Sequence, residues 1–261
     1  MILIAGPCVI ESYDHCAFLA DAILQRAAAL GFDFFFKASF DKANRTSSLG
    51  YRGPGLERGL EILMAVKQKT GVQLTTDIHE ARQARAAAEV VDLIQIPALL
   101  SRQTDLIEAA ARTKKPINLK KGQFMAPEDM RHAALKAQIA GAERIFLTER
   151  GTTFGYHNLV VDMRSIPIMK ALDKGPVIID ASHAVQRPGA AGAASSGDPE
   201  YIETIALAAI AAGADGIFVE VHERPETALS DGKNSLPLDR LTRLLAMAKR
   251  IAETARWAES L

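Results

Sequence analysis

The sequence predicts an α/β protein that folds as a single (β/α)₈ barrel over residues 1–261. Short apolar runs typical of buried strands recur along the chain, and segments with helical spacing separate them. The chain length agrees, because (β/α)₈ barrels commonly reach roughly 250 residues as one domain. An open, doubly wound sheet is the alternative fold, since strand order cannot be deduced from sequence.

The predicted strands and helices alternate along the chain, as they do in parallel sheets with right-handed crossovers. The eight predicted strands span residues 2–5, 34–38, 72–77, 93–96, 117–120, 145–149, 177–180 and 217–221. The clearest helices, rich in Ala, Leu and charged residues, span 15–30, 57–69, 80–90, 104–113, 128–140, 199–212 and 238–255. Residues 42–53 and 186–199 are rich in Gly, Pro and small residues, and we expect them to be mobile loops that complete the pocket.

Composition and charge restrict the class of protein. The 31 basic and 31 acidic side chains leave no net charge, which argues against nucleic acid as a partner. Two cysteines, Cys8 and Cys16, form no disulfide framework, as is typical of intracellular proteins. The sequence has no basic signal-peptide start and no run of about 18 apolar residues. We therefore expect a cytoplasmic protein with no membrane partner.

Polar residues inside the predicted strands indicate where a site lies. In residues 117–120, alternation places Asn118 and Lys120 on one face and two apolar residues on the other. The outer face of a barrel meets the helices, so the polar face must point inward. The same parity points inward Lys37, Gln73, Thr75, Asp77, Thr148, Arg150 and Glu220. Barrel enzymes build their sites at the carboxyl ends of strands, so this pattern predicts a catalytic mouth. Solvated strand ends would explain only one or two of these residues.

Basic residues gather at this predicted mouth. They lie at or just after predicted strand ends: Lys37, Lys42, Arg45, Arg102, Lys120 and Arg150. A neutral chain that concentrates cations in one place is suited to an anionic ligand, and phosphorylated substrates are the natural class. Inward-facing Lys37 and Lys120 need counter-ions, because an unpaired buried charge is costly. A Schiff-base aldolase that uses either lysine, and a non-catalytic barrel that binds a phosphosugar, are the rival hypotheses.

Four further residues form a candidate metal site. Cys8 follows the first predicted strand, His183 follows the seventh, Glu220 ends the eighth and Asp231 lies in the loop after it. The first, seventh and eighth strands are neighbours in a closed barrel, so these side chains can converge. A thiolate, an imidazole and two carboxylates suit a divalent ion such as Fe²⁺, Zn²⁺, Mn²⁺ or Co²⁺. Taken singly, each residue also has an ordinary structural interpretation.

A long collinear set of motifs resembles one enzyme family. Residues Lys37-Ala-Ser-Phe-Asp-Lys-Ala-Asn-Arg45 resemble the signature of the 3-deoxy-D-manno-octulosonate 8-phosphate synthases. Supporting matches follow in order at residues 5–8, 77–80, 95–98, 102–105, 118–123, 149–156 and 159–164, so the resemblance covers nearly the whole chain.

The resemblance implies a transferase that condenses phosphoenolpyruvate with D-arabinose 5-phosphate and water and releases phosphate. Its product enters the inner core of lipopolysaccharide. A related synthase, which uses erythrose 4-phosphate to form 3-deoxy-arabino-heptulosonate 7-phosphate, is the alternative. That enzyme carries a Lys-Pro-Arg-Thr-Ser loop where this chain has Lys42-Ala-Asn-Arg-Thr46, so Asn44 is the main discriminator.

The resemblance also implies roles for individual residues. The catalytic set is Lys37, Lys42, Lys120, Arg150 and His183. Of these, the lysines and Arg150 contact phosphoenolpyruvate together with Gln95, while Asp77 is a further substrate-binding residue. Asn44, Arg45 and Thr46 hold the sugar phosphate, and Arg102 reaches in from a neighbouring subunit of a homotetramer. Metal-independent members have Asn where this chain has Cys8, so Cys8, His183, Glu220 and Asp231 match the metal-dependent class.

Overall fold

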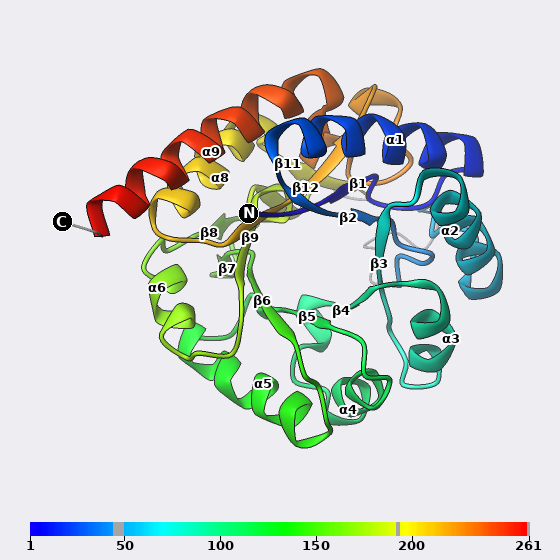
Figure 1. Cartoon of the computed structure of the whole chain (residues 1–261), viewed down its shortest axis with the longest axis horizontal. Helices are drawn as coiled ribbons and strands as arrows, with labels where there is room; N and C mark the ends of the chain where they lie inside the picture. The colour runs from blue at the N-terminus through cyan, green and yellow to red at the C-terminus, as the bar shows by residue number, and fades with distance from the viewer. Residues whose placement is uncertain (44–49, 192–193, 260–261) are drawn as a thin grey trace.

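Eight parallel strands close into a barrel in the computed structural model, which describes residues 1–43, 50–191 and 194–259 (Figure 1). Their bounds are β1 Ile2–Gly6, β2 Asp33–Lys37, β3 Gln73–Asp77, β4 Leu93–Ile96, β5 Ile117–Lys120, β6 Ile145–Glu149, β9 Val177–Asp180 and β12 Gly216–His222. Each strand pairs with the next in this order, and β12 pairs with β1, where Ile2 lies opposite Gly216. The closed barrel is therefore confirmed, and the open sheet is excluded.

Helices surround the barrel on its outer side (Figure 1). They are α1 Tyr13–Leu30, α2 Leu56–Thr70, α3 Gln83–Val90, α4 Thr104–Arg112, α5 Met130–Ile139, α6 Ser165–Lys170, α7 Ala181–Ala184, α8 Ile202–Ala211 and α9 Leu238–Glu259. All seven predicted helices are present. The sequence did not reveal α6 and α7, because segments this short show no helical periodicity. Among the described helices, none is long and apolar enough to cross a membrane.

Strand alternation divides the buried apolar side chains into an outward-facing and an inward-facing group. Outward-facing residues such as Leu3, Phe36 and Val219 pack with the helices in one large apolar cluster. Inward-facing residues that precede the carboxyl ends of the strands form a second cluster: Ile2, Ile4, Phe35, Leu93, Phe146, Ile178 and Phe218. This second cluster, called the apolar floor below, fills the barrel and leaves only its carboxyl end open to a ligand.

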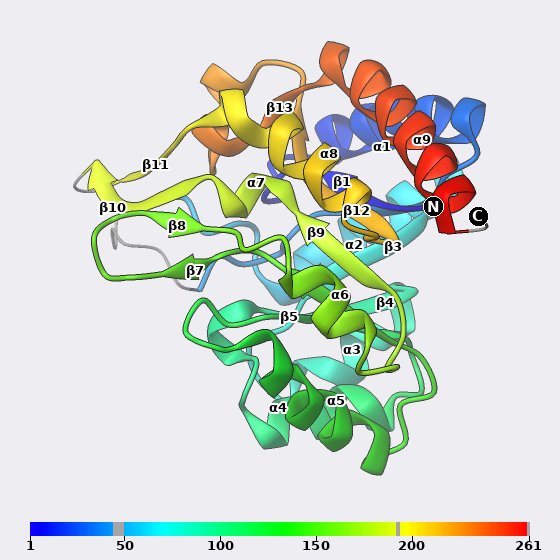
Figure 2. The same ribbon diagram turned by 90° about the vertical axis from the view of Figure 1, so that its left-hand side faces the viewer.

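Two antiparallel hairpins extend beyond the carboxyl ends of the strands. The first pairs β7 Thr152–Thr153 with β8 Leu159–Val160, and the second pairs β10 Gln186–Ala191 with β11 Ala194–Gly197. Figure 2 shows both at the end of the molecule away from the chain termini. A further short strand, β13 Leu236–Pro237, pairs with the end of β12. The predicted sugar-phosphate residues Asn44, Arg45 and Thr46 lie outside the described residues.

Candidate functional site

A cavity of about 520 Å³ opens at the carboxyl end of the barrel. Eight of the predicted site residues line it: Lys37, Lys42, Asp77, Gln95, Lys120, Arg150, His183 and Asp231. Strand alternation explains this convergence, because inward positions on neighbouring strands end at the same mouth. Arg102 differs. It is exposed on the turn after β4, outside the residues described as lining the cavity, and its backbone carbonyl accepts a hydrogen bond from Lys136.

The two inward-facing lysines have buried counter-ions, as the sequence required. Lys37 is 1% exposed, and its Nζ donates to Glu220 Oε1 and to the Cys8 carbonyl, both at 2.9 Å. Lys120 forms an ion pair with Asp180 and lies 3.9 Å above the centre of the Phe218 ring. Burial lowers the pKa of Lys120 in spite of the Asp180 charge. Both cations are therefore fixed in place and face the cavity.

Asp180 was not predicted as a site residue, although it connects two that were. Its carboxylate pairs with Lys120, accepts the His183 backbone N–H at 2.9 Å and lies 2.7 Å from His183 Nδ1. Burial opposes the charge on Asp180, but His183 and Lys120 outweigh it and hold the pKa of this carboxyl well below its usual range. Strand alternation predicts that the Asp180 side chain points inward, because Asp180 follows inward-facing Ile178 by two residues.

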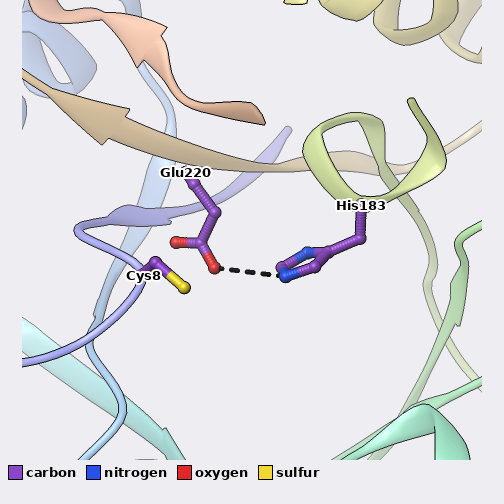
Figure 3. Close-up of side chains that lie close together, drawn as sticks. All are labelled: Cys8, His183 and Glu220. Atoms are coloured by element: carbon purple, nitrogen blue, oxygen red, sulfur yellow. Dashed lines mark ion pairs between the residues drawn. The ribbon is translucent and has the colours of Figure 1, made fainter. Parts of the chain in front are cut away.

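The four predicted metal ligands come together beside the cavity. One donor atom each of Cys8, His183 and Glu220 lies within 4.8 Å of the other two (Figure 3). His183 Nε2 is 3.7 Å from Glu220 Oε1 and 3.8 Å from Asp231 Oδ2. The Cys8 thiol donates to Asp231 Oδ2 over 3.0 Å. The ligands arrive from three neighbouring strand ends, as closure of the barrel requires.

The chemistry of this cluster fits a divalent ion. Within the described chain, Glu220 Oε2 is buried and has no hydrogen-bond partner. His183 Nδ1 is held by Asp180, which leaves Nε2 for an ion, an arrangement common among metal-binding histidines. Burial, together with the negative charge of Asp231, raises the pKa of the Cys8 thiol to about 12. A nearby cation reverses that effect and favours the thiolate.

A chain of side-chain hydrogen bonds orients Gln95. Thr148 Oγ1 donates to Asn118 Oδ1 over 2.5 Å, and Asn118 Nδ2 donates to Gln95 Oε1 over 3.1 Å. With its carbonyl oxygen occupied, Gln95 presents its amide N–H groups to the cavity it lines. The Gln95 amide is therefore oriented to donate hydrogen bonds to an anionic ligand.

Arg150 and Asp77 are also held by neighbours. Arg150 Nη2 donates to Gln186 Oε1 over 2.8 Å, while no described residue accepts a hydrogen bond from its buried Nη1. Gln186, on β10, is a second contact that the sequence did not reveal. Asp77 accepts a hydrogen bond from Ser39 and lies 3.0 Å from His79 Nε2. Burial would raise the pKa of Asp77, but His79 and two lysines hold it well below the usual range.

Lys42 lies where several negative groups meet. Burial would lower its pKa, but Cys8, Asp77 and Glu220 outweigh burial and raise it. The mouth therefore combines an anionic cluster, suited to a metal ion, with a cationic wall suited to phosphate and carboxylate groups.

Comparison with known proteins gives consistent matches along the chain. The model of the DAHP synthetase I family matches residues 1–256. The 2-dehydro-3-deoxyphosphooctonate aldolase of Syntrophotalea carbinolica is 55% identical over 243 residues, which cover 93% of this chain and 87% of that protein. The enzyme of the same name from Pelobacter propionicus is 54% identical, covering 96% and 92%. The one from Cyanothece sp. is 52% identical, covering 98% and 93%.

Proposed function

Because this chain belongs to the DAHP synthetase I family and its curated relatives are 2-dehydro-3-deoxyphosphooctonate aldolases, we propose that it makes 3-deoxy-D-manno-octulosonate 8-phosphate. It condenses phosphoenolpyruvate with D-arabinose 5-phosphate and water and releases inorganic phosphate. The observation that carries this proposal is the cationic wall of the cavity, where Lys37, Lys42, Lys120 and Arg150 converge. Two phosphorylated substrates bring several negative charges, and these side chains offset them.

The cationic wall binds phosphoenolpyruvate. Lys37, Lys42, Lys120 and Arg150 hold its phosphate and carboxylate, and the amide of Gln95 donates a further hydrogen bond. Arg150 Nη1 is free for this purpose among the described contacts. Fixing both substrates in one cavity makes the bimolecular step effectively intramolecular. The preorganised cations offset negative charge without rearrangement during the reaction.

The reaction forms one carbon–carbon bond and breaks one carbon–oxygen bond. C3 of phosphoenolpyruvate attacks the aldehyde carbon of the sugar, and positive charge develops at C2. The aldehyde oxygen takes up a proton and becomes a hydroxyl group. Water adds to C2 and gives up a proton, and the resulting tetrahedral intermediate expels phosphate to leave the C2 keto group.

A divalent ion belongs to this site in our proposal. Cys8, His183, Glu220 and Asp231 hold it, and Asp180 orients the His183 ring. Bound there, the ion supplies Lewis-acid polarisation of a substrate oxygen. His183 is a ligand of the ion, and it also lines the cavity in which the substrates react. Fe²⁺, Zn²⁺, Mn²⁺ and Co²⁺ all suit this mixed sulfur, nitrogen and oxygen ligand set.

We further propose that the chain is one catalytic domain, works in the cytoplasm and assembles as a homotetramer. The exposed position of Arg102 supports this assembly, because its side chain is available to a neighbouring copy. Asn44, Arg45 and Thr46 hold the sugar phosphate and select the five-carbon sugar.

The rival hypotheses have weaker support. The erythrose 4-phosphate enzyme is not favoured, because the curated relatives are named for the eight-carbon product. A Schiff-base aldolase needs an unprotonated lysine that is free to attack a carbonyl group. Lys37 instead pairs with Glu220, and Lys120 pairs with Asp180, which opposes the lowering of its pKa by burial. Borohydride with substrate would trap an imine only in the rival mechanism.

The experiment measures phosphate release from phosphoenolpyruvate with either sugar, each with and without chelator. We expect release only with D-arabinose 5-phosphate, lost on chelation and restored by a divalent ion. Preference for erythrose 4-phosphate would overturn the substrate assignment. Release that chelator leaves unchanged would remove the metal and keep the reaction, and no release with either sugar would reject the function.

A further inference from the structure

A second group of metal-ligating side chains lies outside the cavity, beside the junction of β1 and β12. Glu11 precedes α1, His15 lies in its first turn, His222 ends β12 and Glu223 follows it. One donor atom each of Glu11, His15 and His222 lies within 4.8 Å of the other two. None of the four is among the described residues that line the cavity.

Two buried ring nitrogens face the Glu11 carboxylate. His15 Nδ1 lies 3.9 Å from Glu11 Oε2, and His222 Nε2 lies 3.5 Å from Glu11 Oε1. His15 Nδ1 has no hydrogen-bond partner in the described part of the chain. His222 Nε2, in a side chain only 3% exposed, makes no well-aligned hydrogen bond and only the long 3.5 Å contact with Glu11. A buried polar atom without a partner is costly, so these nitrogens point to a missing ligand.

The surroundings of His15 are those of a metal-binding histidine. Its Nε2 lies 2.9 Å from Glu223 Oε2, and a carboxylate on the far nitrogen commonly fixes the ring of a ligating histidine. Its backbone N–H donates to Ser12 Oγ over 3.1 Å, which fixes the start of α1 and therefore the position of His15. Glu223 and His15 remain partly exposed, so an ion can enter from solvent.

The negative charge of this group also favours a bound cation. It holds two carboxylates, Glu11 and Glu223. Among the residues that the structure describes, no lysine or arginine forms an ion pair with either one. The ion pairs that the structure describes for them are with the imidazoles of His15 and His222. A divalent ion would balance both charges at once.

We propose that Glu11, His15 and His222 bind a divalent ion of the Zn²⁺ class, a site separate from the one at Cys8. Zinc lies about 2.1 Å from nitrogen and oxygen ligands in tetrahedral geometry, so two ligand atoms of one ion are about 3.4 Å apart. The 3.5 Å from His222 Nε2 to Glu11 Oε1 fits this separation. His15 Nδ1 lies 3.9 Å from the other Glu11 oxygen, Oε2, and the 4.8 Å bound on the three donor atoms allows shifts of up to about 1.4 Å on binding. Two imidazoles and a carboxylate form a typical zinc ligand set.

Ligation exchanges one hydrogen bond at His222. The backbone N–H of Arg224 donates to His222 Nδ1 over 2.9 Å, so the ring proton lies on Nε2 before the ion binds. With the ion on Nε2, the proton moves to Nδ1. Glu223 Oε2, 3.3 Å away, accepts it, and the backbone N–H of exposed Arg224, which loses its acceptor, turns to solvent. The Glu223 carboxylate then supports both histidine rings.

The ion would join two segments that serve the main site. Glu11 lies three residues after Cys8, and the segment that follows His222 carries Asp231. Glu11 Oε1 already accepts the backbone N–H of Leu229 over 2.9 Å. The ion therefore has a structural role, fixing the segments that position Cys8 and Asp231.

Cobalt binding tests the site independently of the enzymatic reaction. The full chain, stripped with chelator, is titrated with Co²⁺ while bound metal and absorption are measured. We expect one ion with thiolate-to-cobalt charge-transfer absorption, from the Cys8 site, and a second ion without it. His15→Gln should weaken the second ion at least about 100-fold and keep the thiolate band, whereas Glu223→Gln should weaken it about 10–100-fold.

Matched variants keep the two sites distinguishable. His132 is exposed on α5, so His132→Gln should keep both ions. Cys8→Ser should lose the thiolate band and retain the ion that depends on His15, so a failure at Cys8 is separable from a failure here. Binding that His15→Gln leaves unchanged, in a variant with a native circular dichroism spectrum, would overturn the proposal. A wild-type chain whose only bound ion requires Cys8 would overturn it equally.

Discussion

Two layers of the barrel interior differ in chemistry although the same strands build both. The apolar floor is hydrocarbon, and the layer above it is charged. One pleat separates them on each strand: Phe35 precedes Lys37, Ile178 precedes Asp180, and Phe218 precedes Glu220. Residues two apart share a face and lie roughly 7 Å apart, so floor residues underlie Lys37, Asp180 and Glu220.

The difference shows how one barrel divides stability from chemistry. The floor buries large side chains away from water and stabilises the fold. The charged layer contributes little stability, because the cost of desolvating ions offsets most of their attraction. The apolar floor lowers the dielectric constant on one side of the charged layer, which strengthens the electrostatic interactions of that layer with substrate. The predictions below test this division.

The largest effect is expected from Lys120→Met in the charged layer. We expect kcat/KM to fall at least about 1000-fold, because a fixed cation at the phosphoenolpyruvate site is lost. The fold should survive, since His183 still pairs with Asp180 and methionine replaces the lysine stem above Phe218. Circular dichroism and steady-state kinetics measure both. Lys249→Met, on the exposed face of α9, is the control. Near-normal turnover in a folded variant would refute the site assignment.

The opposite result is expected from Phe146→Ala in the floor. Phe146 is fully buried and packs edge-to-face on Phe35 at 6.1 Å. Its truncation should cost about 3–5 kcal/mol of the free energy of unfolding, as for other buried aromatic residues. Turnover below the unfolding transition should fall less than about tenfold. A large loss of turnover with unchanged urea stability would contradict the division between the layers.

Cys8→Ser tests the metal site, which lies beside the charged layer. We expect affinity for the divalent ion to fall at least about 100-fold, because a thiolate ligand is replaced by a hydroxyl. Activity should fall in parallel and partly return at high metal concentration. Cys8→Asn should retain some activity after chelation, as in the metal-independent class. Full activity of Cys8→Ser after exhaustive chelation would remove Cys8 from the ligand set.

A smaller effect is expected from Thr148→Val, which removes the first donor of the chain that orients Gln95. One neutral hydrogen bond contributes about 1 kcal/mol, so KM for phosphoenolpyruvate should rise about fivefold while kcat stays within about twofold. Thr76→Val is the matched control, because Thr76 donates to the Ala38 carbonyl and has no part in this chain. Equal effects of the two substitutions would indicate a general loss of packing instead.

The smallest effect concerns the pair of Asp77 and His79. Burial opposes protonation of His79, but its hydrogen bond to Asp77 outweighs burial and raises its pKa. Its contribution to stability is therefore complete below the unfolded value, near 6.5, and is lost as pH rises through the folded pKa. His79→Gln should lower the free energy of unfolding at acidic pH more than at pH 9. A difference that grows with pH would contradict the pairing.

Much of the site was predictable because alternation is a local property. All eight barrel strands are predicted by short apolar runs, and the inward position of Lys37, Asn118 and Lys120 follows from a period of two. Asp180 followed the same rule and was overlooked. Gln186 could not be inferred, since its contact with Arg150 depends on the β10–β11 hairpin, which composition had indicated only as a loop.

The sequence by itself determined the elements, the face of each strand and the motifs that indicate the family. The tertiary structure alone decided which charges meet. Lys37 pairs with Glu220, 183 residues away, and Lys120 pairs with Asp180, 60 residues away. The Glu11–His15–His222 group likewise exists only because β12 closes on β1. Periodicity is encoded between near neighbours, whereas these pairings depend on barrel closure, which brings distant strand ends to one mouth.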